Sequence, residues 1–317
     1  MATMSWTADV PGGILKNNAL SSKIRFAAVR DSKFMQFVDT ESGLGRKRGE
    51  NLSVTRIDAL AVPASDVLYE LDTIPEDKFA ISFQTITAVE HGRAVPYTNL
   101  LEELTTFDIN GAIQRTMKDQ LTLSLDKAAA AAAKIGQLKY TPTGLASANV
   151  STNGVAGATA TANLNMFHVE AIRDLMFTDY NVPRYGNGAD FMAIVSTRAR
   201  RGIMQDPKWE EWHKYTDAES KYMGEIGRIE NIRFIEDNNS AVLANNLGTG
   251  GVLGEAVFFG SDALIMGSVV DPEMRLKNPT DYGRSKGVAW YGVYGFGQIW
   301  SNSANPGQAR ILHVTSL

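Results

Sequence analysis

The sequence contains no cysteine, which excludes disulfide bonds, thiolate nucleophiles and cysteine-ligated zinc. Histidine is also scarce, and the four present do not have the HExxH spacing of a zinc enzyme: His91, His168, His213 and His313. We therefore expect no metal site, and we interpret the histidines as surface or interface residues.

Long apolar runs are missing as well, since no stretch reaches the roughly 18 residues that a membrane helix needs. The N-terminus lacks the basic start and apolar centre of a signal peptide, so we expect a soluble product made in the cytoplasm. The net charge of -4 and pI of about 5.7 give no basic excess, which argues against sequence-specific DNA binding.

Motifs for catalysis are absent too. The glycines at 292, 295 and 297 lie inside a predicted strand and form neither a dinucleotide nor a phosphate loop, and no GxSxG elbow occurs. Glu102 and Glu103, with Asp108 nearby, could supply a general acid and base. Adjacent side chains point in different directions, however, so we expect these acids to support helix starts or to pair with basic groups on a neighbouring molecule. The sequence predicts no enzyme and no cofactor.

What is present is the composition of a folded protein, with 44% hydrophobic and 21% charged residues in 317. This length suits two domains, or one domain with long excursions. The clearest element is a helix over about 108–134, in which apolar residues recur every four positions before an alanine run, with Asp108 as its cap. The alanines either admit another backbone closely or form a simple helix tail.

Two strands are predicted before this helix. Residues 52–57 alternate, and residues 79–89 place Phe79, Ile81 and Phe83 on one face and Ile86 on the other. Some twenty residues connect the two strands, which indicates an extended loop. A two-stranded ribbon is barely stable alone, so we expect it to pack against a neighbouring subunit. Residues 14–39 carry a helical apolar stripe that fits an amphipathic arm or a core helix equally well.

The second half alternates helix and strand and predicts a compact α/β unit. The expected elements are a helix over 165–177, a buried strand over 191–195, a helix from Thr197 interrupted at Pro207, single strands over 226–235 and 257–259, and a loop over 238–251. Residues 288–300 form a strand with one aromatic face and a glycine face where a helix could lie. Residues 309–314 are its predicted hairpin partner.

Two clusters are candidate contacts. The basic triplet Arg46, Lys47 and Arg48 is too small to hold nucleic acid, and we favour contact with an acidic patch on an adjacent subunit. Trp209 and Trp212 share one face of a helix and serve either as core residues or as inter-subunit anchors.

This order of parts resembles the major capsid proteins of tailed bacteriophages, in particular those of the short-tailed branch. Four segments carry the likeness: EHGRAVPYTNLLEELTTFDIN (90–110), GEIGRIENIRFIEDNN (224–239), GEAVFFGSDALIMG (254–267) and GRSKGVAWYGVYGFGQIW (283–300). The first is similar to the family's approach to its spine helix, the third to a strand followed by a helix, and the last to its late glycine-and-aromatic strand.

The resemblance implies an α+β capsid fold with an N-terminal arm (1–39), an extended loop (40–92), a peripheral domain (93–180 and 268–317) and an axial domain (181–267). It implies hexamers and pentamers that form an icosahedral virion shell around double-stranded DNA. Scaffolding, portal and decoration proteins are the implied partners, and the sequence identifies no residues for covalent cross-linking.

Two alternatives are an encapsulin-type nanocompartment shell and an enzyme with an unrecognised site. A deep polar pocket in the monomer would favour the enzyme. If the capsid interpretation is right, deleting residues 1–38 or 58–78 should leave a folded subunit that does not close shells.

Overall fold

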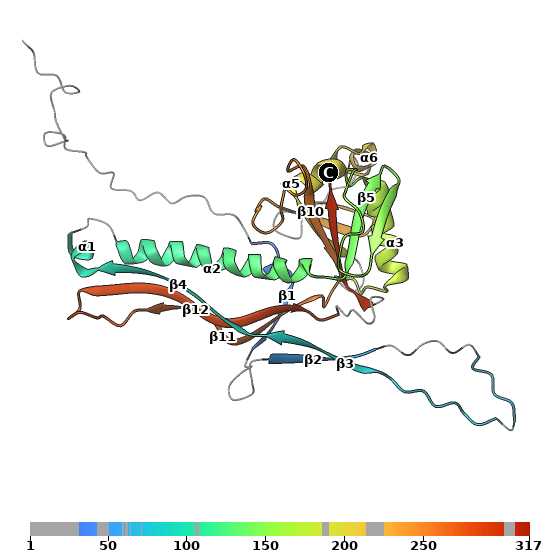
Figure 1. Cartoon of the computed structure of the whole chain (residues 1–317), viewed down its shortest axis with the longest axis horizontal. Helices are drawn as coiled ribbons and strands as arrows, with labels where there is room; N and C mark the ends of the chain where they lie inside the picture. Colours follow the sequence, from blue (N-terminus) through green and yellow to red (C-terminus); the bar gives the residue numbers. More distant parts are fainter. Residues whose placement is uncertain are drawn as a thin grey trace, which may run out of the picture.

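The computed structural model describes residues 32–42, 51–58, 60, 63, 65–70, 72–104, 108–185, 190–213, 225–300 and 308–317, without the side chains of residues 212 and 213. In this part of the chain a seven-stranded sheet forms a compact body, and a long helix lies along a four-stranded sheet that extends away from it (Figure 1). A two-stranded ribbon projects separately. No helix of the described part is long and apolar enough to cross a membrane.

The seven-stranded sheet has the order β6-β5-β13-β10-β7-β9-β8. Its strands are β5 (Leu138–Gly144), β6 (Ser147–Ser151), β7 (Phe191–Ser196), β8 (Glu225–Ile229), β9 (Ile232–Asp237), β10 (Gly254–Phe259) and β13 (Ile311–Ser316). Every residue of the central strands β7 and β10 is buried, because both faces of the sheet are covered.

One face of this sheet packs against short helices. These are α3 (Met166–Asp174), the π-helix η3 (Leu175–Asp179), α5 (Thr197–Met204) and α6 (Pro207–His213). Asn165 and Ser196 cap α3 and α5 by accepting hydrogen bonds from the backbone of His168 and Ala199. The interruption expected at Pro207 separates α5 from α6, as predicted.

The four-stranded sheet has the order β1-β11-β12-β4. Its strands are β1 (Val38–Ser42), β4 (Val89–Thr98), β11 (Leu264–Leu276) and β12 (Ser285–Gln298), and the short helix α1 (Asn99–Leu104) follows β4. The predicted division of the chain differs from this pairing, because β5, β6 and β13 belong to the seven-stranded sheet and not to a body with β4 and β12.

Helix α2 (Ile109–Lys134) connects the two sheets. Its predicted cap is confirmed, since Oδ1 of Asp108 accepts a 2.9 Å hydrogen bond from the backbone N–H of Gly111. Four alanines near the C-terminal end are buried among side chains from β7 and β10. The alanine run therefore permits close packing, as one of its two interpretations proposed.

The aromatic face of β12 turns toward α2, and Nε1 of Trp290 donates to Oε1 of Gln120 across 3.2 Å. The prediction that a helix covers the glycine face of this strand is wrong. A Cβ on Gly295 or Gly297 would meet Ile86 of β3 (Ile81–Thr87). Because Gly295 and Gly297 have no side chains, the ribbon can pack closely against β12.

Three other expectations need correction. Residues 226–235 form two strands, because Glu230 and Asn231 adopt positive φ and turn the chain. Strand β13 pairs with β10 and β5 rather than with β12. The segment 254–267 is strand β10 followed by strand β11, with no helix.

The described end of the predicted arm is part of the core. Phe34 and Phe37, at the 3-10 turn η2 (Met35–Phe37), are buried beside the alanines of α2. The stripe predicted within residues 14–31 lies outside the described residues. A deletion of residues 1–38 would remove these two core side chains, so the prediction that it leaves a folded subunit is wrong.

Candidate assembly surfaces

The ribbon pairs β2 (Asn51–Ile57) with β3 in antiparallel register, with Ile57 opposite Ile81 and Leu52 opposite Ile86. Side chains along each strand alternate between two faces. The inner face carries Leu52 and Ile86, and the outer face carries Ile81 and Phe83.

The inner face anchors the ribbon to its own subunit. Leu52 and Ile86 are buried in a cluster with Ile265 and Ile299, and Nη1 of Arg56 donates to the carbonyl of Ile299 at 3.0 Å. The expectation that the ribbon finds its packing only on a neighbour is therefore wrong for its base. It is this base that sets the direction in which the ribbon projects.

The outer face stays uncovered within the subunit. Ile57, Ile81 and Phe83 are 61%, 63% and 68% exposed. The predicted alternation is confirmed, but the bulkier face is the exposed one. The long connection beyond it carries further exposed apolar residues, among them Val67, Tyr69 and Ile74. Residues 58–78 also contain six acidic residues and one lysine, so the tip is both apolar and acidic.

A second exposed apolar surface lies at the end of the four-stranded sheet far from the seven-stranded body. Leu100 and Leu104 of α1 and Tyr282 in the β11–β12 connection are exposed. The backbone N–H of Asn99 donates to the carbonyl of Arg284, and Lys286 pairs with Glu102 at 2.8 Å. These contacts hold α1 beside the connection between the strands.

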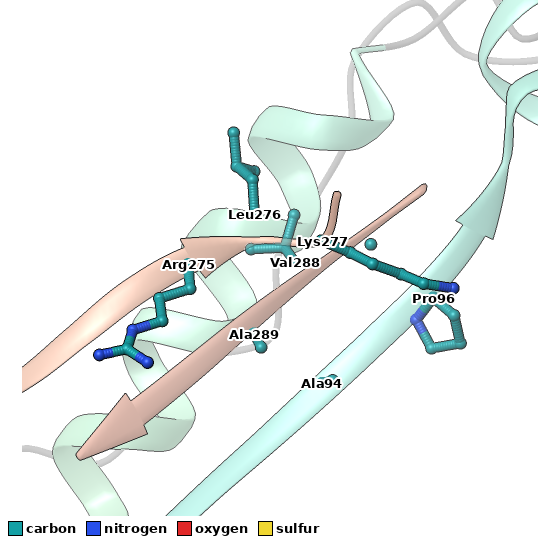
Figure 2. A pocket seen from close by; sticks show the side chains of 8 residues that line it. Ala94, Pro96, Arg275, Leu276, Lys277, Val288 and Ala289 are labelled. Carbon is teal, nitrogen blue, oxygen red and sulfur yellow. The ribbon is translucent and has the colours of Figure 1, made fainter. Parts of the chain in front are cut away.

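An open trough crosses the same end of this sheet (Figure 2). It has a volume of about 270 Å³, and its floor is made of the small residues Ala94, Pro96, Gly287 and Ala289. Two cations border it. The Arg275 guanidinium lies 4.2 Å from the ring centre of Tyr291, and Nζ of Lys277 donates to Oγ of Ser285. Arg275 also pairs with Glu273 at 2.7 Å. The trough is therefore apolar in its floor, with Lys277 and the paired Arg275 at its border.

The predicted contact residues do not form one site. Arg46, Lys47 and Arg48 lie outside the described residues. Glu102 pairs within its own subunit, and Glu103 is exposed on α1. The acids do not assemble a catalytic pair, since Asp108 caps α2.

The tryptophans divide differently from the prediction. Trp209 is 5% exposed and packs edge-on against Phe234, with 5.5 Å between ring centres. This burial corrects its assignment as an assembly contact and supports the core interpretation. The side chain of Trp212 lies outside the described part.

The interpretation of all four histidines as surface or interface residues is wrong for His168, which is fully buried, and for His313, whose side chain is only 11% exposed. His168 lies between the Tyr140 hydroxyl and the carbonyl of Gly144, at 3.0 and 2.9 Å, and His313 contacts Glu255 at 3.2 Å. His91 stacks on Tyr294, with 4.4 Å between ring centres. Across the described ranges, no three His, Asp or Glu side chains gather as metal ligands.

Sequence reasoning missed the outward orientation of Ile81 and Phe83 and the trough altogether. Alternation shows that a strand has two faces but not which of them the rest of the chain covers. The available signal was the acidic tip, whose charge disfavours burial inside the same subunit. The trough combines the consecutive strands β11 and β12 with β4, which is distant from them in sequence.

Comparison with known proteins agrees with this geometry. A family model described as phage capsid protein matches residues 82–304, well over half of the chain. No curated protein matches the sequence.

Three solved structures share the fold at low identity. The capsid of cyanophage Pam1 matches with a TM-score of 0.70 and 13% identity, over 100% of this chain and 99% of that one. The capsid of Ralstonia phage GP4 gives 0.68 and 14%, over 98% of both chains. The capsid of cyanophage P-SCSP1u gives 0.68 and 11%, over 96% of this chain and 94% of the other.

These matches extend over nearly the whole length of both partners, and they confirm the predicted α+β tailed-phage capsid fold. They favour neither the enzyme nor the encapsulin alternative. The chain belongs to the phage capsid protein family and is a structural, non-enzymatic subunit of a virion capsid.

Proposed function

We propose that copies of this chain form hexamers and pentamers that close an icosahedral shell around phage double-stranded DNA, and that the shell assembles in the host cytoplasm. Family membership supports the capsid role. The short-tailed branch remains a prediction, as do scaffolding, portal and decoration partners. DNA contact would be non-specific, because the net charge of -4 offers no basic surface excess.

The observation that carries the proposal is the uncovered outer face of the ribbon. Burying a side chain of the size of Ile81 or Phe83 contributes roughly 1.5–3 kcal/mol, and the isolated subunit forgoes this at both positions. Identical chains that repeat one contact around a ring recover it in every copy.

The trough on the four-stranded sheet is the receptor that we propose for the ribbon tip of a neighbouring copy. Its small-residue floor would accept apolar side chains such as Tyr69 or Ile74. Lys277 at its border would complement the six acids of residues 58–78, and Arg275 would do so beside its own pair with Glu273. The two surfaces lie on separate projections of one subunit, so the contact joins different copies.

In this arrangement we assign the predicted arm, extended loop, axial domain and peripheral domain to parts of the fold. The arm proposed for residues 1–39 ends in the core at Phe34 and Phe37, and the extended loop proposed for 40–92 runs between β1 and β4. The seven-stranded sheet forms the axial body, and α2 with the four-stranded sheet forms the peripheral body. The triplet at 46–48 and Glu103 stay as proposed inter-subunit contacts. Glu102 would make such a contact only in addition to its pair with Lys286.

Replacing Phe83 with aspartate tests the proposal. The Phe83→Asp subunit should fold with an unchanged circular dichroism spectrum, because the side chain is exposed, but it should not form closed particles in the electron microscope. Phe83→Tyr keeps the aromatic area and should assemble. Normal particles from Phe83→Asp would overturn the proposed contact.

A further inference from the structure

A single buried carboxylate joins the end of α2 to the seven-stranded sheet. Glu255 of β10 pairs with Lys134, the last residue of α2, and receives a 2.7 Å hydrogen bond from the backbone N–H of Ala244. Its other oxygen, Oε1, lies 3.2 Å from Nε2 of His313 in β13. The side chains of Glu255 and His313 are 7% and 11% exposed, so these contacts are made away from bulk water.

Lys139 of β5 completes the cluster. Its ammonium donates to the backbone carbonyl of Lys134, which is one of the free carbonyls at the end of α2. The same Nζ lies 3.4 Å from Nδ1 of His313. Lys139 thus caps the helix and contacts the imidazole at the same time.

These partners define the protonation state of His313. An ammonium group has no acceptor, so Nδ1 must accept from Lys139, and Nε2 must carry the proton donated to the Glu255 carboxylate. The imidazole is therefore neutral. A second proton would sit on Nδ1 and point at the ammonium of Lys139.

We propose that Glu255, His313, Lys134 and Lys139 form a proton-operated lock between the spine helix and the seven-stranded sheet. Protonation of His313 expels Lys139 from Nδ1 and from the carbonyl of Lys134, so the last turn of α2 loses this cap and loosens, while Gln298 still donates to the carbonyls of Ala132 and Ala133. The lock deepens the proposed capsid role, because it would let acid change the angle between the two bodies of a subunit.

The charges around His313 support this direction. The charged groups that face it within the described chain are Lys134 from α2, Lys139 from β5 and Glu255 from β10. Burial lowers the pKa of His313, the hydrogen bond to Glu255 opposes this, and Lys139 lowers the pKa further. Although burial alone would raise the pKa of Glu255, hydrogen bonds from His313, Lys134 and Ala244 lower it to about 2. Glu255 therefore stays ionised while His313 takes up its proton.

Hydrogen exchange on the unassembled full-length subunit tests the lock. The measured quantity is the protection factor of backbone amides 131–139, corrected for the intrinsic pH dependence of exchange, at about pH 7.5 and about pH 5. We expect the wild-type protein to lose roughly tenfold of this protection at the lower pH, which corresponds to about 1.4 kcal/mol. His313→Gln preserves a donor and an acceptor without a titrating ring, and it should lose no protection.

Two further variants make the outcome specific. His168→Gln changes a buried histidine that contacts Tyr140 and Gly144 rather than the four residues of the lock, and it should keep the acid response of amides 131–139. Lys139→Met removes the cap, so protection should be low at both pH values; this variant decides the question if His313→Gln does not fold. An acid response that persists in Lys139→Met or His313→Gln, or its absence from the wild type, would overturn the lock. Because no shell is needed, failure here leaves the capsid proposal standing, and failure of assembly leaves the lock standing.

Discussion

The side chain of Ile86 occupies the space that a side chain on Gly297 would need, since a Cβ on Gly297 would lie 2.6 Å from Cγ1 of Ile86. A Cβ on the neighbouring Gly295 would come within 2.3 Å of the Thr87 carbonyl. The ribbon therefore rests on the bare face of β12. This contact determines where the uncovered outer face of the ribbon is presented.

Gly297→Ala should force the ribbon base away from β12. We expect a loss of about 1–3 kcal/mol in the free energy of unfolding, because overpacking a well-filled site displaces its neighbours. Urea denaturation measures the loss. Gly287→Ala is the matched control in the same strand, since its nearest neighbours lie at 3.3 Å and beyond. Equal unfolding free energies of the two variants would contradict this prediction, because they would show that Ile86 moves aside at no measurable cost.

Asp126 of α2 anchors residues 32–34 to the helix. Its Oδ1 accepts hydrogen bonds from the Ser32 hydroxyl at 2.7 Å and from the backbone N–H groups of Lys33 and Phe34 at 3.1 and 2.8 Å. Asp126→Ala leaves these donors without their acceptor, so we expect a loss of about 2–4 kcal/mol in unfolding free energy. Asp126→Asn keeps the acceptor and should lose less than about 1 kcal/mol. Limited proteolysis near residue 32 gives a second readout, with faster cleavage expected only in the alanine variant.

The elements that could be predicted are those whose signal lies within one short stretch of sequence. The predicted spine helix is α2, and Asp108 is its cap. Both could be predicted because the apolar spacing and an aspartate directly before the helix are visible in the sequence itself. The buried strand at 191–195 appears in β7 for the same reason, since a short unbroken apolar run suits a sheet covered on both faces.

Long-range pairing was not predictable in this way. The glycine face of β12 is equally compatible with a helix or a ribbon, and only the tertiary structure puts Ile86 there. Strand β13 follows β12 in sequence but pairs with β10, because its alternating apolar residues fit the core of the other sheet. The segment 225–237 contains a turn at Glu230 and Asn231, which adopt positive φ without a glycine, so the usual sequence signal of a turn is missing.

His168 should make the subunit less stable in acid. The Gly144 carbonyl can only accept, so Nε2 carries the proton and Nδ1 accepts from the Tyr140 hydroxyl; burial raises the pKa of Tyr140 to about 12, which keeps that hydroxyl protonated. Burial lowers the pKa of His168 below its ordinary 6.5, and the hydrogen bond to Gly144 opposes this only in part.

The direction of this pH dependence of stability follows from proton uptake. Below about pH 6.5 the unfolded chain protonates this histidine before the folded chain does, so stability is present above that pH and is lost as the pH falls. The loss approaches about 1.4 kcal/mol per pH unit for one proton. Urea denaturation at several pH values between about 7.5 and 5 gives the slope of the unfolding free energy against pH. This slope should be smaller by up to this amount in His168→Gln than in the wild type. An unchanged slope would mean that the folded protein protonates His168 freely.

The acidic tip offers the most direct test of assembly through uncovered surface. The backbone N–H of Asp58 donates to the carbonyl of Ala80, so an Asn-Gly turn joining these two residues would close the ribbon without residues 59–79. The shortened subunit should unfold at the same urea concentration as the full chain, because the described part of the removed segment is exposed. Electron microscopy of both proteins, purified under the same assembly conditions, then measures the central claim. We predict uniform hollow particles from the full chain and only unassembled subunits from the shortened one, whereas closed particles of normal size from the shortened protein would contradict the account.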